Sequence, residues 1–287
     1  MDGKKKHRWS DVVRIVVLLI GIVVLLYPTI SNYLYEKNSS GIVDHYDDTM
    51  EKMTEEERLQ ILEKARQYNA QLVGNTQIAG DTFNVGNETT EEYARLLSMD
   101  KSGMMGYIII PEINVELPVY HTTKEAVLQK GVGHLPSSSL PVGGESTHTV
   151  LTGHRGLPSR MLFTDLDQLE NGDVFYLKVF GETLAYQVDR IVTVLPKETD
   201  DLQIEAGKDY ATLITCTPYA INTHRLLVRG KRIPYEEAEK IEEPTIDHGL
   251  KIPFEVRVLL IAVGILFMIL IGWRMAVKRK NKRRKKL

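Results

Sequence analysis

The sequence predicts a mainly β domain, folded as a small closed barrel or a sandwich, that lies between two membrane-spanning helices. Three observations support this fold class. Short runs rich in β-branched and aromatic residues, divided by turn signals, fill residues 104–233. Each end of the 287-residue chain combines an apolar run with a basic segment. The stretch between the first apolar run and the β-rich region is acidic and has a helical pattern.

Charge is distributed unevenly along the chain. The chain has 36 Lys/Arg and 38 Asp/Glu residues. The first 14 positions hold five basic and two acidic residues, and the last 14 hold nine basic residues and no acidic one. The positions between them therefore hold 22 basic and 36 acidic residues. An acidic body of this kind argues against nucleic acid as a partner. The single cysteine, Cys216, excludes an internal disulfide and a multi-cysteine metal site, and we expect neither a metal nor a cofactor.

The first apolar run, Val12–Leu26, contains one charge, at Arg14, and predicts a membrane helix over residues 12–30. A basic segment before an apolar run can also begin a cleavable signal peptide. The residues that follow, Tyr27–Asn32, lack the small-x-small pattern of a cleavage site. We therefore expect an uncleaved anchor, preceded by a basic cytoplasmic end at residues 1–11.

The second apolar run, Val258–Trp273, has no charge and predicts a membrane helix over residues 254–274. The basic tail behind it, residues 275–287, could bind nucleic acid, but directly beside an apolar helix it is typical of a stop-transfer signal that contacts anionic lipid. The positive-inside rule then places both termini in the cytoplasm and residues 31–253 outside the cell membrane.

Residues 31–103 are predicted to be an N-terminal helical segment. Thr54 and Glu57 have the spacing of a capping box. Apolar residues then recur every three or four positions, which predicts one buried helix face: Leu59, Leu62, Ala65, Tyr68 and Leu72. A second, short helix is expected over Glu88–Leu97, and the stretch between the helices, Gly74–Gly86, is expected to be an exposed loop because it is rich in Gly, Asn and Thr.

Seven strands are predicted within residues 104–233. They are Gly106–Ile110, Val115–Val119, His148–Gly153, Val174–Val179, Leu184–Leu195, Tyr210–Thr215 and His224–Arg232. Residues 234–253 carry six Asp/Glu against two Lys, and we interpret them as an acidic tether to the second membrane helix.

Cys216 is the first candidate for chemistry. A lone cysteine is often a small buried hydrophobe, but Cys216 ends a predicted strand, and Pro218 then forces the chain out of that strand. An accessible, unpaired thiol in an oxidising compartment is a liability unless it is used. As a nucleophile it needs a proton partner and a group that stabilises an oxyanion.

His154 and Arg225 could supply these two functions. His154 follows a predicted strand on a glycine-flanked turn, so it also lies at a strand end. Arg225 opens the last predicted strand, and a hairpin would return it beside Cys216, where its guanidinium could hold an oxyanion or a peptide carbonyl. On these residues alone, a polar histidine without a catalytic role and a surface arginine remain open alternatives.

Two motifs resemble a known family. Thr212–Cys216 (Thr-Leu-Ile-Thr-Cys) matches the Thr-Leu-X-Thr-Cys signature of sortases, the Gram-positive cell-surface transpeptidases, and Thr152–Gly156 matches the family's histidine motif. Further stretches are similar to the pilus-assembling class C: Thr217–Gly230, Gly131–His134 and Ser139–Gly144. The similarity runs from about Gly106 to Ile233, and two anchors around an acidic ectodomain also resemble class C.

The resemblance implies a closed sortase-type β-barrel over residues 104–233 and a division of labour. Cys216 would be the nucleophile, His154 the acid and base, and Arg225 the stabiliser of the substrate carbonyl and oxyanion. Thr215 and His134 would assist or bind substrate. The implied reaction cleaves a Leu-Pro-X-Thr-Gly (LPxTG) sorting signal between Thr and Gly through a thioester. An amine, in the pilus class a pilin lysine, then takes the acyl group, and pili polymerise.

A lid is a further feature that the resemblance implies. Many pilus sortases are similar in an N-terminal Asp-Pro-aromatic segment, whose Asp pairs with the catalytic Arg while the ring covers the Cys. Here the matching residues are Asp81, Thr82 and Phe83, so Thr replaces Pro. We expect Asp81 and Phe83 to form a lid over Cys216. The alternative is a polar surface loop with a coincidental match.

Three other functions remain as alternatives. A housekeeping-type sortase would join surface proteins to a peptidoglycan amine instead of a pilin lysine. A secreted cysteine peptidase would hydrolyse its acyl-enzyme. A membrane-tethered adhesion or scaffold protein would keep its function after Cys216→Ala.

Overall fold

The computed structural model describes residues 2–74, 78, 80–83, 89–99, 102–157 and 159–249, together with 254, 256–258, 260–265, 267–268 and 272. The chain divides into two units, Met1–Tyr33 with Gly249–Leu287, and Leu34–His248. We describe each unit by itself.

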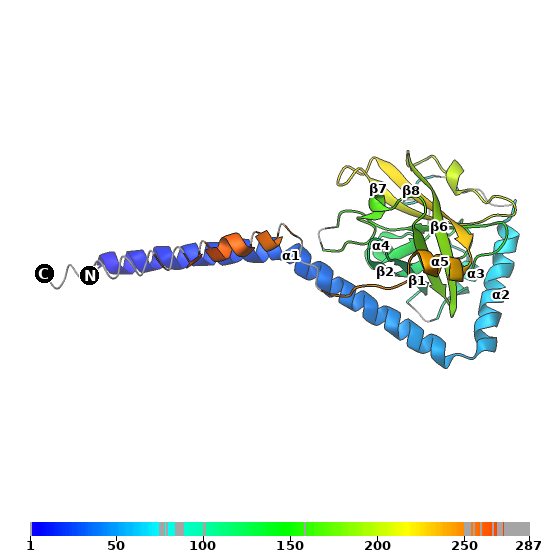
Figure 1. The fold of residues 1–287 in the computed structure, drawn as a ribbon, viewed down its shortest axis with the longest axis horizontal. Coiled ribbons are helices and arrows are strands. Elements are labelled where there is room, and N and C mark those ends of the chain that lie inside the picture. Colours follow the sequence, from blue (N-terminus) through cyan, green and yellow to red (C-terminus); the bar gives the residue numbers. More distant parts are fainter. Residues whose placement is uncertain are drawn as a thin grey trace. The chain divides into compact units, whose positions relative to one another are not determined.

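The unit Leu34–His248 contains a closed eight-stranded β-barrel with the strand order β1-β2-β3-β4-β7-β8-β6-β5. Figure 1 shows the barrel, with β1, β2, β6, β7 and β8 labelled. The strands are β1 (Met104–Ile110), β2 (Val115–His121), β3 (Val132–His134), β4 (Thr147–Thr152), β5 (Val174–Val179), β6 (Glu182–Val194), β7 (Asp209–Thr217) and β8 (His224–Ile233). Two neighbouring pairs are parallel, β2 with β3 and β4 with β7, and the others are antiparallel. Closure leaves no open sheet edge and rules out the sandwich.

The seven predicted strands are all present, with ends that differ by at most two residues from the observed ones. The strand that sequence reasoning missed is β3, which has three residues. It is too short to show an alternating pattern, and its Gly133 stands where a Cβ would come within 2.5 Å of the Thr122 carbonyl oxygen. At Gly133 the backbone of β3 therefore approaches the neighbouring Thr122 segment closely, which a glycine permits.

The core extends beyond the barrel interior because α1 (Asp2–Lys52) covers part of its wall. All seven residues of β1 are buried, and they share one hydrophobic core with Val43, Tyr46 and Met50 of α1. The hydroxyl of Tyr46 donates to the Met105 carbonyl at 3.1 Å and accepts from the Phe180 N–H at 2.7 Å. A strand buried on both faces explains the continuous apolar run of β1.

Helix α2 (Glu55–Leu72) begins with the predicted capping box. The Thr54 hydroxyl accepts from the Glu57 N–H at 3.2 Å, and the Glu57 carboxylate accepts from the Thr54 N–H at 2.9 Å. The predicted buried face was wrong at Leu59, which is exposed. The helix instead buries Asn69, whose side chain bonds both backbone groups of Leu140 at 2.7 and 3.0 Å.

The remaining helices are short. They are α3 (Glu91–Arg95), α4 (Glu125–Leu128), α5 (Tyr235–Ile241) and the 3₁₀ turns Leu166–Gln168 and Asp200–Leu202. Helix α3 is shorter than the expected Glu88–Leu97, because Thr90 caps it by accepting from the Tyr93 N–H at 3.1 Å. Glu88 lies outside the described residues. The beginning of the expected tether is helical, since α5 buries Ala238 against the barrel.

One helical span among the described residues, Val16–Lys52 within α1, is long and apolar enough to cross a membrane. It overlaps the first predicted anchor, residues 12–30, and the helix continues through Pro28 to Lys52. A second membrane helix is not shown. The apolar helix in the second predicted span, Val256–Ile265, is shorter than a membrane crossing, and the basic tail, residues 275–287, lies outside the described residues.

Candidate active site

Strand pairing brings three candidate residues to one end of the barrel. In the parallel pair β4 and β7, Thr152 is the partner of Ile214, and the chain continues by two residues from each of them, to His154 and to Cys216. In the antiparallel pair β7 and β8, Cys216 is the direct partner of Arg225. The three side chains therefore lie at the same end of three neighbouring strands.

The turn that carries His154 is held by backbone contacts with β7. The Gly153 N–H donates to the Ile214 carbonyl at 3.0 Å, and the buried Thr215 hydroxyl donates to the Gly153 carbonyl at 2.8 Å. A Cβ on Gly153 would lie 2.6 Å from the ring of Phe163, so only glycine fits there without a shift. Thr215 thus acts on the turn before His154, which is how its hydroxyl can assist.

Arg225 is engaged by the loop residues that sequence reasoning identified as a lid. Its Nε and Nη2 donate to the two carboxylate oxygens of Asp81 at 3.0 and 2.7 Å. The Phe83 ring centroid lies 4.9 Å from the guanidinium carbon of Arg225 and 5.8 Å from the centre of the His154 ring. Asp81 and Phe83 therefore contact two of the three candidate residues. Such a bidentate pair is among the stronger polar contacts in proteins.

The thiol of Cys216 is partly buried, and burial raises its pKa above the ordinary value. The positive charge of Arg225 lowers the pKa, and the negative charge of Asp81 raises it. Since the thiolate is the nucleophilic form, this arrangement keeps the sulfur mainly protonated and unreactive at neutral pH.

His154 has a partner that sequence reasoning missed. Its Nε2 lies 3.1 and 3.3 Å from the carboxylate oxygens of Glu125, the first residue of α4. A hydrogen bond from the Gln129 amide and the nearby His154 lower the pKa of Glu125. No local pattern signals this contact, because Glu125 precedes His154 by 29 residues and only the barrel brings them together.

His134 is not brought to these residues. It is fully buried in β3, where its Nδ1 lies 2.9 Å from the Tyr93 hydroxyl and its Nε2 lies 2.8 Å from the Ser139 carbonyl. Burial lowers its pKa to about 3, so the ring is neutral. Within the described part of the chain, its contacts are those of a core histidine, and a direct assisting role has no contact to support it.

The loop that contains Asp81 is also held at Ile78, although the whole stretch was expected to be exposed. The side chain of Gln203 accepts from the Ile78 N–H at 3.3 Å and donates to its carbonyl at 3.0 Å, and the Thr199 hydroxyl donates to the same carbonyl at 2.7 Å. The Ile78 side chain is buried in an apolar cluster formed by Leu135, Val150, Leu202, Ile214 and Leu227. Thr82 is also buried among the residues of this loop that the structure describes, and within that part of the chain its hydroxyl has no hydrogen-bond partner.

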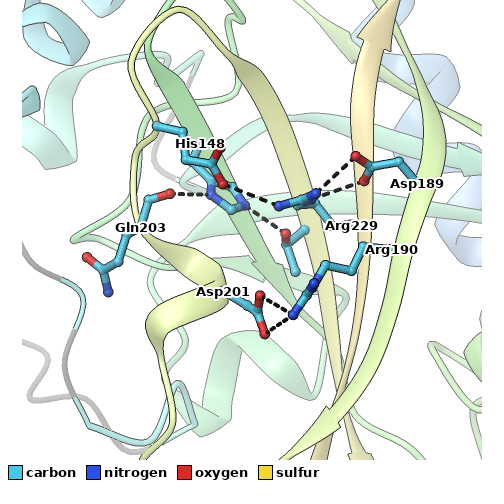
Figure 2. Close-up of polar contacts among 8 residues, drawn as sticks. His148, Asp189, Arg190, Asp201, Gln203 and Arg229 are labelled. Carbon is cyan, nitrogen blue, oxygen red and sulfur yellow. Dashed lines mark hydrogen bonds and ion pairs between the residues drawn. The ribbon is translucent and has the colours of Figure 1, made fainter.

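Gln203 lies on the loop between β6 and β7, and polar contacts fasten this loop to the barrel (Figure 2). Arg190 of β6 pairs with Asp201 at 2.8 Å. His148 lies with Nδ1 2.9 Å from the Gln203 carbonyl and Nε2 2.7 Å from the Thr212 hydroxyl. Because a carbonyl can only accept, Nδ1 carries the proton and Nε2 accepts from Thr212. The described residues contain no cluster of three or more His, Cys, Asp or Glu that could hold a metal ion.

Comparison with known proteins identifies related chains. Residues 108–233 match the model of the sortase domain. Sortase A of Bacillus anthracis is 27% identical over 226 residues, which cover 78% of this chain and 95% of the relative. Sortase D of Bacillus subtilis (strain 168) is 31% identical over 131 residues, which cover 45% of this chain and 63% of the relative.

Solved structures are more similar. The crystal structure of sortase C from Streptococcus pneumoniae is 49% identical, with a TM-score of 0.63, and the match covers 68% of this chain and 97% of that one. Sortase C1 from Streptococcus agalactiae is 50% identical, with a TM-score of 0.62 and coverage of 67% and 98%. Sortase C-1 from Actinomyces oris is 45% identical, with a TM-score of 0.59 and coverage of 62% and 99%.

Proposed function

This chain belongs to the sortase family of cysteine transpeptidases, with strong structural likeness to class C, and we propose that it polymerises pilins. In this proposal it cleaves a Leu-Pro-X-Thr-Gly-like signal between Thr and Gly and transfers the acyl group to a pilin lysine. The observation that carries the proposal is the strand pairing that sets Cys216 opposite Arg225, with His154 two residues beyond the Thr152–Ile214 pair at the same end of the barrel.

The first half-reaction forms a thioester. The Cys216 thiolate attacks the threonine carbonyl carbon, and the Arg225 guanidinium donates hydrogen bonds to the oxyanion that develops. The C–N bond to glycine then breaks, and His154 gives a proton to the departing amine. Because Arg225 is the direct strand partner of Cys216, its positive charge lies where negative charge appears in both steps.

In the second half-reaction a lysine amine attacks the thioester carbon. His154 removes a proton from this amine, the C–S bond breaks, and an isopeptide bond joins the two proteins. A pilin lysine is favoured because sortase C of S. pneumoniae, which is 49% identical, is described in terms of its pilin substrate specificity. A peptidoglycan amine would use the same first half-reaction, so the acceptor separates the pilus type from the housekeeping type.

The contacts of Asp81 and Phe83 support a lid that inhibits the enzyme at rest. Asp81 occupies both donors of Arg225 that face it, so that the arginine is not free to bind a substrate carbonyl. Phe83 lies against the guanidinium of Arg225 and the ring of His154. Substrate access then requires the Asp81–Arg225 pair to separate, after which the pKa of Cys216 falls because a negative neighbour has left.

The apolar span of α1 supports a membrane anchor with the barrel on the outer face. The basic residues at 4–8 and in the tail favour a cytoplasmic location for both termini, which requires the second predicted crossing, residues 254–274. Cysteine labelling from outside intact cells, with single cysteines added near each terminus of a Cys216→Ala chain, tests this topology. Labelling of either terminus would contradict it.

The proposed reaction is tested by mixing the full chain in detergent with a candidate pilin that carries the sorting signal and following products by intact mass. Covalent pilin ladders that are absent with Cys216→Ala are the expected result. Cys216-dependent cleavage with transfer only to a peptidoglycan-type amine would show the housekeeping alternative. Ladders that persist with Cys216→Ala would overturn the proposal.

A further inference from the structure

We propose that Glu125 is a positioning residue for His154, and that it assigns the transferred proton to Nδ1 of the ring. This inference rests on the acid and base role proposed above for His154. Glu125 lies on α4, outside the motifs that carry the family resemblance. Both of its carboxylate oxygens face Nε2 of His154, at 3.1 and 3.3 Å.

The carboxylate of Glu125 is itself held in place. The side-chain amide of Gln129, one helical turn later, donates to its Oε1 at 2.6 Å. Gln129 is in turn fixed by Arg160, whose Nη1 donates to the Gln129 side-chain oxygen at 3.2 Å and also to its backbone carbonyl. A chain of contacts thus runs from Arg160 through Gln129 and Glu125 to His154.

Arg160 also connects this chain of contacts to α1. Its guanidinium carbon lies 5.3 Å from the centre of the Tyr35 ring, and the Tyr35 hydroxyl donates to the Lys130 carbonyl at 2.8 Å. The end of the segment that follows Glu125 is therefore held both by Arg160 and by Tyr35 of α1. Although the Glu125 side chain is 68% exposed, the groups that orient it come from three separate parts of the chain.

The contact decides which ring nitrogen can exchange a proton with substrate. A carboxylate only accepts, so Nε2 of His154 must carry a hydrogen and donate it to Glu125. Nδ1 has no hydrogen-bond partner among the described residues. In the charged ring Nδ1 also carries a proton, and it gives this proton to the departing glycine amine. The neutral ring keeps its hydrogen on Nε2, so that Nδ1 is ready to accept a proton from the incoming lysine.

The test compares two substrates in single-turnover reactions of the full chain in detergent, with Asp81→Ala as the parent so that the lid does not limit the rate. One substrate is the Leu-Pro-X-Thr-Gly peptide, whose amine leaving group needs a proton. The other replaces the scissile amide by an activated ester, whose leaving group needs none. Variants are Glu125→Ala, Glu125→Asp, His154→Ala and, as a matched control, Glu145→Gln, which changes an exposed carboxylate outside the site.

Glu125→Ala is expected to slow thioester formation from the amide about two- to fivefold, the range for an exposed ion pair. The ester reaction should keep its rate, Glu125→Asp should recover part of the loss, and Glu145→Gln should change neither reaction. An unchanged amide rate, or an equal loss with both substrates, would overturn the role of Glu125. If His154→Ala left amide cleavage intact, the proposed function itself would fail, which separates the two ideas.

Discussion

At the scale of single residues, Arg225 has two competing partners. It faces Cys216 across β7 and β8, and it is held by the Asp81 carboxylate. The charge of Asp81 neutralises the arginine and also raises the pKa of Cys216, after burial as the larger cause. One carboxylate therefore occupies the proposed oxyanion donor and raises the pKa of the thiol at the same time.

Asp81→Asn is expected to accelerate alkylation of Cys216 and to move its pH profile to lower pH. With the charge removed, the pKa of the thiol falls, so a given thiolate fraction is reached at lower pH. The measurement is the iodoacetamide reaction rate of the full chain between pH 6 and 10. Glu182→Gln, which removes a carboxylate that pairs with Arg66 away from the lid, is the control and should leave the profile in place.

A profile that stays unchanged with Asp81→Asn would contradict the electrostatic part of the lid proposal. A faster reaction at every pH without displacement of the inflection would mean that Asp81 controls access alone.

At the scale of elements, the site depends on β7 and its two neighbours, and these strands were the easiest to predict. Turn signals bound their runs, and their motifs are local: Thr212–Cys216 lies near the end of β7, and Thr152–Gly156 begins at the last residue of β4. Contacts between distant segments could not be predicted in this way. Gln203 and Ile78 are 125 residues apart, and Glu125 meets His154 only because β2, β3 and β4 are adjacent in the barrel.

Local patterns also leave the surroundings of a side chain undetermined. His134 has the same residue type as His154 and also follows a glycine, but it lies inside a strand and Tyr93 and Ser139 satisfy its ring. Leu59 fits the apolar spacing of α2. The residues that the helix buries are Leu62, Ala65 and Asn69, and Leu59 is not among them. Local patterns identify an element, whereas its buried face depends on which partner covers it.

The anchor at Ile78 makes the lid depend on the loop between β6 and β7. Gln203→Ala removes two hydrogen bonds to the Ile78 backbone while leaving its own backbone contact with His148. At about 1 kcal/mol for a hydrogen bond, alkylation of Cys216 should accelerate about fivefold or more. Gln187→Ala is a matched control, because its side chain bonds the Gly172 carbonyl on another part of the barrel. Acceleration by Asp81→Asn without any by Gln203→Ala would show that Ile78 does not restrain the lid.

At the scale of the whole molecule, two buried histidines make the barrel sensitive to acid. Burial lowers the pKa of His134 to about 3 and that of His148 to about 4, from an ordinary value of 6.5. The unfolded chain therefore binds protons as the pH falls below about 6.5, while the folded chain does not. The stability contributed by the neutral rings is complete above pH 6.5 and is lost as the pH falls toward 4.

Thermal unfolding of the full chain should show this loss as a midpoint that decreases from pH 7 to pH 4.5. Each histidine contributes up to about 1.4 kcal/mol per pH unit in this range. His134→Gln should lower the midpoint at pH 7 and flatten its pH dependence, whereas His45→Gln, an exposed control, should leave the curve unchanged. An equally steep curve for His134→Gln would mean that His134 is not the group responsible.

The account as a whole depends on Cys216 as the residue that carries the acyl group. The most direct test incubates the full chain, in its Asp81→Ala form, with a Leu-Pro-X-Thr-Gly peptide, quenches in acid and locates the added mass by peptide mapping. The predicted result is a hydroxylamine-sensitive adduct, equal in mass to the peptide up to Thr, on the fragment that contains Cys216, and none with Cys216→Ala. Cleavage of the peptide with the adduct on another residue, or with no adduct while Cys216→Ala remains active, would contradict the account.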